Sequence, residues 1–227
     1  MEYGQFCPVA KAAEIIGEKW TILIIREILI GGASRFSDLQ RGLGTISPTL
    51  LTRRLSSLEQ AGLLIKKKIQ GRRGHEYFAT SSCEDLRPIL MSLGGWGMKW
   101  AHTNLTAKDY NVELLMLYLQ RSIVPENLPG NGFVVRFSFS DMAERKNWWL
   151  LTDHGLVDTC DRDPGRDVDI YVNTTVKTMV DIWTGKTTYR KAQANDDLSL
   201  VGPSALTKNV STWMNNSVFS GAETTIQ

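Results

Sequence analysis

The stretch from Ser34 to Thr80 constrains the fold more than any other part of this sequence. It contains, in order, a helix, a second helix that begins at Ser47-Pro48, and two extended segments joined by the turn Gly71-Arg72-Arg73-Gly74. A serine side chain accepts a hydrogen bond from a free amide of the first helical turn, and proline suits the next position because it has no amide to leave unpaired. Two helices followed by a two-stranded ribbon predict a winged helix-turn-helix fold.

The second helix is predicted to run from Ser47 to about Leu63, with Gly62 in a left-handed C-terminal cap. Leucines recur on one side at helical spacing, so this side is expected to face a core: Leu51, Leu55 and Leu58. The opposite side, called the polar face below, carries Thr49, Thr52, Arg53 and Ser56. A helix fits the DNA major groove, where threonine and arginine side chains bond base edges. The alternative is an ordinary solvated helix face.

The distribution of charge favours the DNA interpretation. Between Arg35 and His75, nine basic side chains face two acidic ones, Asp38 and Glu59, which gives a net charge of +7 against +2 for the whole chain. The basic residues are Arg35, Arg41, Arg53, Arg54, Lys66, Lys67, Lys68, Arg72 and Arg73. Positive charge gathered on one segment is what phosphate binding with counterion release requires.

The candidate DNA-binding residues combine the polar face, its helix cap and nearby cations. They are Arg35, Ser47, Thr49, Thr52, Arg53, Arg54, Ser56, Lys67, Arg72 and Arg73. Arg72 and Arg73 lie at the predicted tip of the ribbon, within reach of a flanking phosphate or the minor groove.

The chain is long enough for two domains, and its charge changes along its length. Residues 1–107 carry 14 basic and 9 acidic side chains, whereas residues 108–227 carry 12 and 15. We therefore expect a boundary near residue 107. The sequence contains neither a run of about 18 apolar residues nor a signal-peptide pattern, so a cytoplasmic location is expected.

No catalytic or metal-binding pattern stands out. The three cysteines, Cys7, Cys83 and Cys160, are widely spaced, which argues against a disulfide framework and against metal binding. The aspartates between Asp161 and Asp169 are separated by Arg162, Pro164 and Arg166 and lack the closing glutamate of a calcium loop. We expect a protein that is not an enzyme and needs no cofactor or metal.

The helices that flank the basic segment indicate a partner subunit. Residues 20–30 are predicted to form a helix that is apolar on almost every side, which in a small domain suggests cover by a second chain. After the ribbon, Ser81 and Glu84 have capping-box spacing and are predicted to begin a helix that continues to Trp100. Gly94, Gly95 and Gly97 indicate either close approach of two helices or a kink.

Residues 6–102 contain an ordered set of motifs. They are Cys7-Pro8-Val9, Gly17-Glu18-Lys19-Trp20-Thr21, Arg35-Phe36-Ser37-Asp38-Leu39, Ile46-Ser47-Pro48, Leu50-Leu51-Thr52-Arg53-Arg54-Leu55, Leu58-Glu59-Gln60-Ala61-Gly62-Leu63, Tyr77 and Leu93-Gly94-Gly95-Trp96. This set resembles the HxlR family of bacterial winged-helix regulators. The resemblance implies a homodimer, held by the first and last helices of the domain, that binds a palindromic operator and usually represses. The family's Thr-x-x-Gly after the wing is replaced here by Thr80-Ser81-Ser82-Cys83.

Cys7 has a second interpretation. In some members of that family the cysteine of the Cys-Pro motif senses oxidants or electrophiles, and the resemblance extends this role to Cys7 as an alternative. The plainer interpretation is a small residue that packs before a helix.

Residues 108–227 predict an α+β domain. Helices are expected over 111–123, from Val176 to Trp183 and over 204–218, and strands around Phe133–Phe139, Trp148–Thr152, Leu156–Cys160, Val168–Val172 and Leu198–Val201. Asp153-His154-Gly155 marks a hairpin turn. This order predicts an antiparallel sheet covered by helices.

The same order, with Asp169-Ile170-Tyr171-Val172 and Trp183-Thr184-Gly185-Lys186, resembles a sterol carrier protein-type domain over about residues 110–220. The resemblance implies a hydrophobic ligand held between sheet and helices. The candidate lining residues are Phe137, Trp148, Trp149, Met179, Trp183 and Trp213, whose alternative role is to fill the core.

The sequence therefore predicts a homodimeric DNA-binding regulator that responds to an apolar small molecule or uses its second domain to support the dimer. The main alternative is a lipid or sterol-like carrier whose winged helix is a protein-docking scaffold. The second alternative is a redox-sensing repressor that acts through Cys7.

Overall fold

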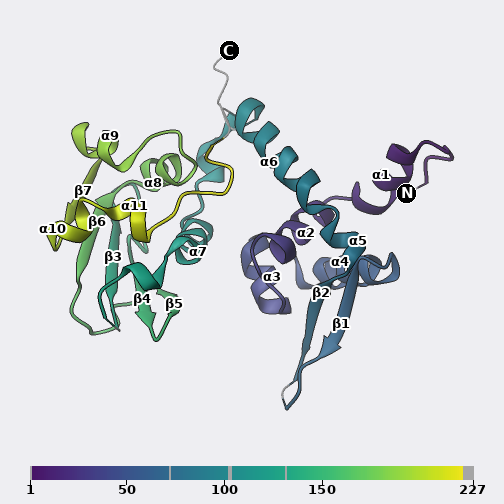
Figure 1. The fold of residues 1–227 in the computed structure, drawn as a ribbon, viewed down its shortest axis with the longest axis horizontal. Coiled ribbons are helices and arrows are strands. Elements are labelled where there is room, and N and C mark those ends of the chain that lie inside the picture. The colour runs from purple at the N-terminus through teal and green to yellow at the C-terminus, as the bar shows by residue number, and fades with distance from the viewer. Residues whose placement is uncertain (1, 72, 102–103, 131, 222–227) are drawn as a thin grey trace. The chain divides into compact units, whose positions relative to one another are not determined.

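The structure, a computed structural model, describes residues 2–71, 73–101, 104–130 and 132–221. The chain divides into two compact units, Met1–Gly94 and Gly95–Gln227, and each is described by itself (Figure 1). The division falls inside helix α6 (Arg87–Trp100), ahead of the boundary that the sequence predicts near residue 107.

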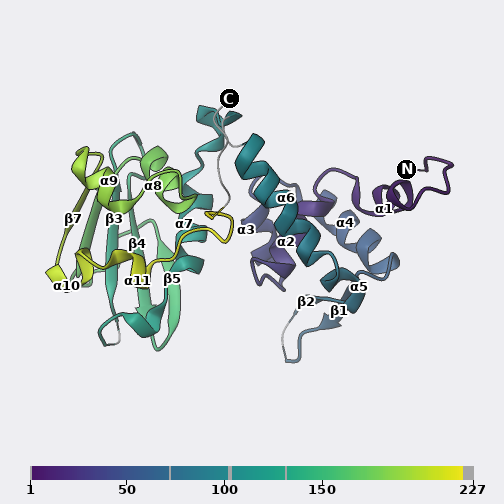
Figure 2. The same cartoon turned by 45° about the horizontal axis from the view of Figure 1, so that its top comes forward.

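The first unit has the predicted order of elements. Its helices are α1 (Pro8–Ile16), α2 (Thr21–Leu29), α3 (Phe36–Leu43), α4 (Pro48–Gln60), α5 (Ser81–Glu84) and the first part of α6. Its strands β1 (Leu64–Lys68) and β2 (His75–Ala79) pair antiparallel with Leu64 opposite Ala79, and they form the wing. Figure 2 shows this hairpin projecting beyond the helices of the same unit.

Helix α4 begins and ends as its sequence predicts. The Ser47 hydroxyl accepts a hydrogen bond from the Leu50 amide at 3.3 Å, and Pro48 occupies the first helical position. At the other end Gly62 has a φ of +72°, and the Leu63 amide donates to the Leu58 carbonyl at 3.0 Å. These features form a Schellman C-cap, so the helix ends at Gln60, slightly before Leu63.

The apolar side of α4 supplies the centre of the first core. Leu51, Leu55 and Leu58 are at most 2% exposed and pack with Ile24 and Ile25 of α2 in one cluster. Burial of each leucine stabilises the unit by about 1.5–3 kcal/mol. This contact fixes α4 so that its opposite side remains at the surface.

The helix after the wing differs from the prediction. Thr80, not Ser81, is the N-cap, because its hydroxyl accepts from the Cys83 amide at 3.3 Å. The predicted single helix is divided into α5 and α6, with Asp85 as the C-cap of α5. Helix α6 then continues through Gly94, Gly95 and Gly97, so these glycines do not end it.

The second unit contains the remainder of α6 and an α+β arrangement. Its other helices are η2 (Ala107–Asp109), α7 (Val112–Ser122), η3 (Pro125–Asn127), α8 (Val176–Trp183), α9 (Tyr189–Ala194), α10 (Ser204–Thr207) and α11 (Val210–Trp213). Its strands are β3 (Val134–Phe139), β4 (Asn147–Asp153), β5 (Leu156–Cys160), β6 (Ile170–Thr174) and β7 (Leu198–Val201).

The sheet is mixed, so the prediction of an antiparallel sheet is wrong. Its strand order is β5-β4-β3-β6-β7, and the central pair β3 and β6 is parallel, with Phe137 opposite Val172. The other neighbouring pairs are antiparallel. A parallel pair needs a crossover, and the long connection from β5 to β6 supplies it. The sequence shows each strand's apolar alternation but not which strands become neighbours.

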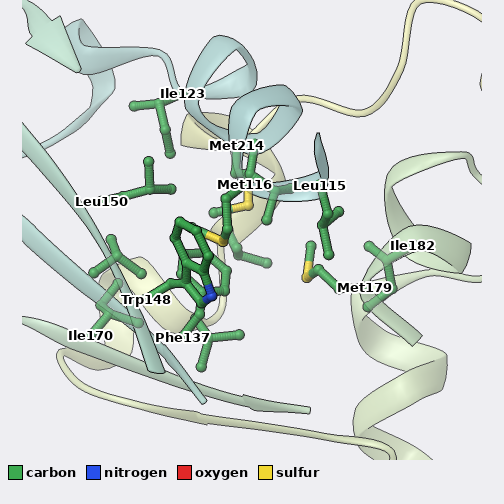
Figure 3. Packing of buried hydrophobic residues seen from close by; sticks show 14 of the residues in the cluster. Leu115, Met116, Ile123, Phe137, Trp148, Leu150, Ile170, Met179, Ile182 and Met214 are labelled. Atoms are coloured by element: carbon green, nitrogen blue, oxygen red, sulfur yellow. The ribbon is translucent and has the colours of Figure 1, made fainter. Parts of the chain in front are cut away.

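One face of this sheet and the helices enclose the second core. Phe137 and Leu150 of the sheet meet Met116 of α7 and Met179 of α8 in one buried cluster (Figure 3). Trp213 of α11 belongs to the same cluster. All five residues are at most 1% exposed, and the partly buried Trp183 packs against the cluster.

The C-terminal part of the prediction also needs correction. The single helix expected over 204–218 is two short helices, α10 and α11, separated by Lys208 and Asn209. The side-chain amide of Asn209 donates to the Ala205 carbonyl at 2.9 Å, and this local bond competes with continuation of the helix. Helix α9 was not predicted at all; its six residues are too few for a clear helical period.

Candidate nucleic-acid interface

The polar face of α4 lies at the surface of the first unit. Thr49, Thr52, Arg53 and Ser56 are all exposed, while the leucines on the other side of the helix are buried. The Thr52 hydroxyl donates to the Pro48 carbonyl at 2.9 Å, so its oxygen remains available as an acceptor. The structure therefore places these side chains where a helix in a groove would need them.

The two neighbouring arginines of α4 have different surroundings. Arg53 is exposed, and its side chain has no hydrogen-bond or ion-pair partner among the described residues, so its guanidinium is available for a base or a phosphate. Arg54 pairs with Glu18, in the segment between α1 and α2, and only 11% of its side chain is exposed. Arg54 is thus mostly covered within its own unit whereas Arg53 is not, because a single-residue shift along a helix turns a side chain by about 100°.

The wing carries further cations. Lys67 is exposed on β1, with its ammonium 5.1 Å from the centre of the Phe78 ring on β2. Arg73 is exposed in the turn, whereas Arg72 lies outside the described residues. Gly71 and Gly74 have φ values of +70° and +116°, which explains why glycines flank this turn.

Arg35, at the N-cap of α3, forms an ion pair with the wing. Its Nε donates to the Glu76 carboxylate at 3.2 Å, and the amide of Tyr77 donates to the Ser34 carbonyl at 2.8 Å. Because 47% of the Arg35 side chain is exposed, a phosphate can compete with Glu76 for it. Arg35 thus has a structural role in addition to its candidate role at DNA.

The candidate DNA-binding residues leave out three exposed basic side chains of the same unit. Arg41 lies near the end of α3, and Lys66 and Lys68 lie on β1. Within the described part of the chain, the side chains of these three residues make no hydrogen bond or ion pair. The net charge of the segment was the signal that could have found them.

An exposed apolar stripe runs along the surface of α6. Ile89, Leu93, Trp96 and Trp100 recur at spacings of four and three residues, and each is more than 40% exposed. In the first unit, Ile89 and Leu93 also border an apolar pocket with Ile16 of α1 and Ile22 and Ile25 of α2. No residue of α1 is buried, and Val9 is 76% exposed. Exposed apolar surface of this extent along one helix marks an interaction site.

The cysteines of the first unit differ in accessibility. Cys7 is exposed at the N-cap of α1. Cys83 is fully buried, and burial raises the pKa of its thiol to about 11. Only Cys7 of these two is placed for reaction with a reagent in solution.

The candidate lining residues of the second unit lie in its core. Phe137, Trp148, Met179 and Trp213 belong to the buried cluster, and Trp183 packs against it. The indole amides of Trp148, Trp183 and Trp213 donate to Arg145 O, Ser122 Oγ and Leu206 O, respectively. Trp149 is buried too, but it lies on the other face of the sheet, beneath Arg136. The structure brings five of the six together and separates Trp149.

Among the described residues, no group of three or more histidine, cysteine or acidic side chains is arranged to hold a metal ion. Their helices also include none that is long and apolar enough to cross a membrane.

Comparison with known proteins gives a family match in the first half of the chain. The profile of the family described as HxlR-like helix-turn-helix matches residues 15–105. The chain is similar to the uncharacterized HTH-type transcriptional regulator YvaP of Bacillus subtilis, with 31% identity over 102 residues that cover 44% of this chain and 94% of YvaP. It is also similar to Rv3095 of Mycobacterium tuberculosis, another uncharacterized HTH-type transcriptional regulator, with 39% identity over 39% of this chain. The match spans 56% of Rv3095, about half of its length.

Among solved structures, the chain is similar to that of the redox regulator HypR in its oxidized form. It shares 29% identity, covers 40% of this chain and 94% of HypR, and has a TM-score of 0.37.

Proposed function

The chain belongs to the HxlR-like helix-turn-helix family, and from this membership we propose that it is a sequence-specific DNA-binding transcriptional regulator and not an enzyme. The single observation that carries the proposal is the exposed polar face of α4, held outward by the buried leucines on its other side.

The proposed contacts follow from the placement of each side chain. The polar face enters the major groove, where Arg53 bonds a guanine edge and Thr49 and Thr52 bond bases or phosphates. Arg73 and Lys67 of the wing, with Arg41, bind flanking phosphates and set the register. Base contacts then supply specificity, and phosphate contacts supply affinity that depends on salt.

The protein is proposed to act as a homodimer on a palindromic operator. The apolar stripe of α6 and the exposed α1 are the surfaces that a second copy would cover. Two polar faces related by a two-fold axis would contact two half-sites of one operator. Such a regulator would act in the cytoplasm, and repression follows if its operator overlaps a promoter.

For the second unit we propose that an apolar effector, of the kind a sterol carrier-type domain holds, enters between the sheet and helices α7, α8 and α11. The observation in favour is the apolar core enclosed there. An effector regulates only if it binds the DNA-competent and DNA-incompetent arrangements with different affinities. Without such an effector, the unit serves to support the dimer.

The proposed function is tested by selecting bound fragments from random genomic DNA and measuring their affinity by mobility shift at several salt concentrations. A recovered palindromic site bound at least about 10³-fold more tightly than random duplex is the expected result. Equal affinity for all fragments at low salt would reject sequence-specific regulation and favour the carrier alternative. Repeating the assay with decanoate or cholesterol tests the effector: operator affinity that neither compound changes speaks against regulation by these lipids.

A further inference from the structure

The sheet of the second unit has one face that the helices do not cover. Along each strand, alternate residues point away from the core cluster, and on this uncovered face they include Trp149 of β4, Arg136 of β3, Tyr171 of β6 and Val201 of β7. The solvated face of a sheet is normally polar. Here Tyr171 is 38% exposed, Val201 is 55% exposed, and Leu156 of β5, on the same face, is 75% exposed.

Arg136 is held at the centre of this face without an anionic partner. Its guanidinium carbon lies 5.6 Å from the ring centre of Trp149 and 5.9 Å from that of Tyr171. Its Nε is buried and has no hydrogen-bond partner, and none of the described carboxylates pairs with it. Stacking between two rings orients the charge but supplies no acceptor.

A second donor beside Arg136 also lacks an acceptor. The Trp149 side chain is 94% covered, and its Nε1 is buried without a hydrogen-bond partner, unlike the indole amides of the core tryptophans. A buried donor that makes no bond costs about 1–3 kcal/mol. The uncompensated charge of Arg136, on a face that also exposes Tyr171, Val201 and Leu156, indicates that this surface is completed by another molecule.

The same face carries an unpaired carboxylate. Asp158 of β5 is exposed, and no described cation pairs with it; its Oδ1 accepts only from the adjacent Thr159 amide at 2.8 Å. Arg136 lies opposite Trp149, and Asp158 lies opposite Leu151. The two charges therefore lie on the strands that flank β4 and are offset along it by the two residues from Trp149 to Leu151.

We propose that the uncovered face binds the same face of a second copy of this chain. A two-fold axis that lies in the face and passes between Trp149 and Leu151 brings each Arg136 over the Asp158 of the other copy. The two ion pairs then flank a contact centred on Leu151, while Trp149 lies beneath Arg136 and Tyr171 lies on the far side of Arg136 from Asp158. Each carboxylate supplies the anionic partner that Arg136 lacks in a single copy. Tryptophan, tyrosine and arginine are the residues that dominate binding energy in such contacts.

The test exchanges charges in the full-length chain. Arg136→Asp and Asp158→Arg are each made in a chain that also carries Trp96→Glu, so that the stripe of α6 contributes little to association. Association is measured by sedimentation velocity and native mass spectrometry over a range of concentrations. Each single exchange should weaken self-association at least about tenfold, because like charges then face each other. Arg190→Asp on α9, an exposed residue of the same unit, is the matched control and should leave association unchanged.

Mixing the two variants decides the question. An Arg136→Asp chain and an Asp158→Arg chain are complementary only in the mixed dimer, so heterodimers should make up nearly all dimers, well above the roughly one half that random pairing gives. A random mixture of species, or single variants that associate like the control, would overturn the proposed interface. The result is independent of operator binding, so this inference and the proposed function can fail separately.

Discussion

Arg54, in the middle of the recognition helix α4, forms an ion pair with Glu18 in the segment that joins α1 to α2. This contact explains why two adjacent arginines of the same helix have different roles. Arg53 is left for DNA, whereas Arg54 connects α4 to the N-terminal segment of its own unit.

Loss of this ion pair should lower stability. Because Arg54 is mostly buried and Glu18 is partly exposed, we expect Glu18→Gln and Arg54→Gln each to lower the free energy of unfolding by about 1–2 kcal/mol. Urea denaturation measures the loss, and the double variant should lose less than the sum of the two. Fully additive losses would show that the pair contributes nothing. Selectivity for operator over random DNA should persist while the variants remain folded.

Arg53 and Arg73 should have distinguishable effects on DNA binding. Arg53→Ala should weaken operator binding by about 1–3 kcal/mol and relax base preference at one position, since a bidentate base contact is lost. Arg73→Ala should weaken binding to every sequence alike and reduce the salt slope by about one. Mobility shifts on operator and random duplex at several salt concentrations measure both. Unchanged operator affinity for Arg53→Ala would remove this residue from the interface.

The left-handed cap at Gly62 should be sensitive to substitution. Open space surrounds the position where a Cβ would lie, so any cost of Gly62→Ala comes from its φ of +72°. We expect a loss of about 1–2 kcal/mol in the free energy of unfolding. Gly62→Asn is the matched control and should lose less, since asparagine tolerates this conformation. Equal losses for the two variants would contradict a conformational cause.

Trp96 tests the proposed dimer. A glutamate at this 59% exposed position should leave the fold intact but place a charge in the apolar stripe, so Trp96→Glu should shift the chain toward monomer and weaken operator binding at least tenfold. Light scattering and mobility shift measure the two effects. Glu113→Ala, at an exposed position on α7, is a suitable control for expression and folding. A Trp96→Glu chain that dimerises like the parent would exclude α6 from the interface.

The cysteines should react in a definite order. With its pKa raised to about 11, Cys83 remains a protonated, buried thiol at pH 8 and should be alkylated by iodoacetamide only slowly, and faster as the pH approaches 11. Exposed Cys7 should react first, as peptide mass mapping after short exposures can show. If Cys7 senses oxidants, diamide should lower operator affinity in the parent chain but not in Cys7→Ser. The same diamide response in both chains would rule out this role for Cys7.

The boundaries of α4 are determined by residues that are close to them in the sequence. Ser47, Pro48 and Gly62 act within one turn of their own positions, so the sequence was sufficient to place the start of the helix and its cap. The leucine spacing likewise identified the buried side and therefore the polar face. These features depend on neighbours in the chain, which is why they could be predicted.

Pairings between distant residues were decided by the tertiary structure. The bond between Arg54 and Glu18 and the parallel pairing of β3 with β6 join segments far apart in the chain, and several partners would have satisfied the same local patterns. Which carboxylate meets an arginine, and which strand lies beside another, follows from packing of the whole core. By itself the sequence determined a basic winged helix with an outward polar face; the folded chain decided which of its charges remain free for DNA.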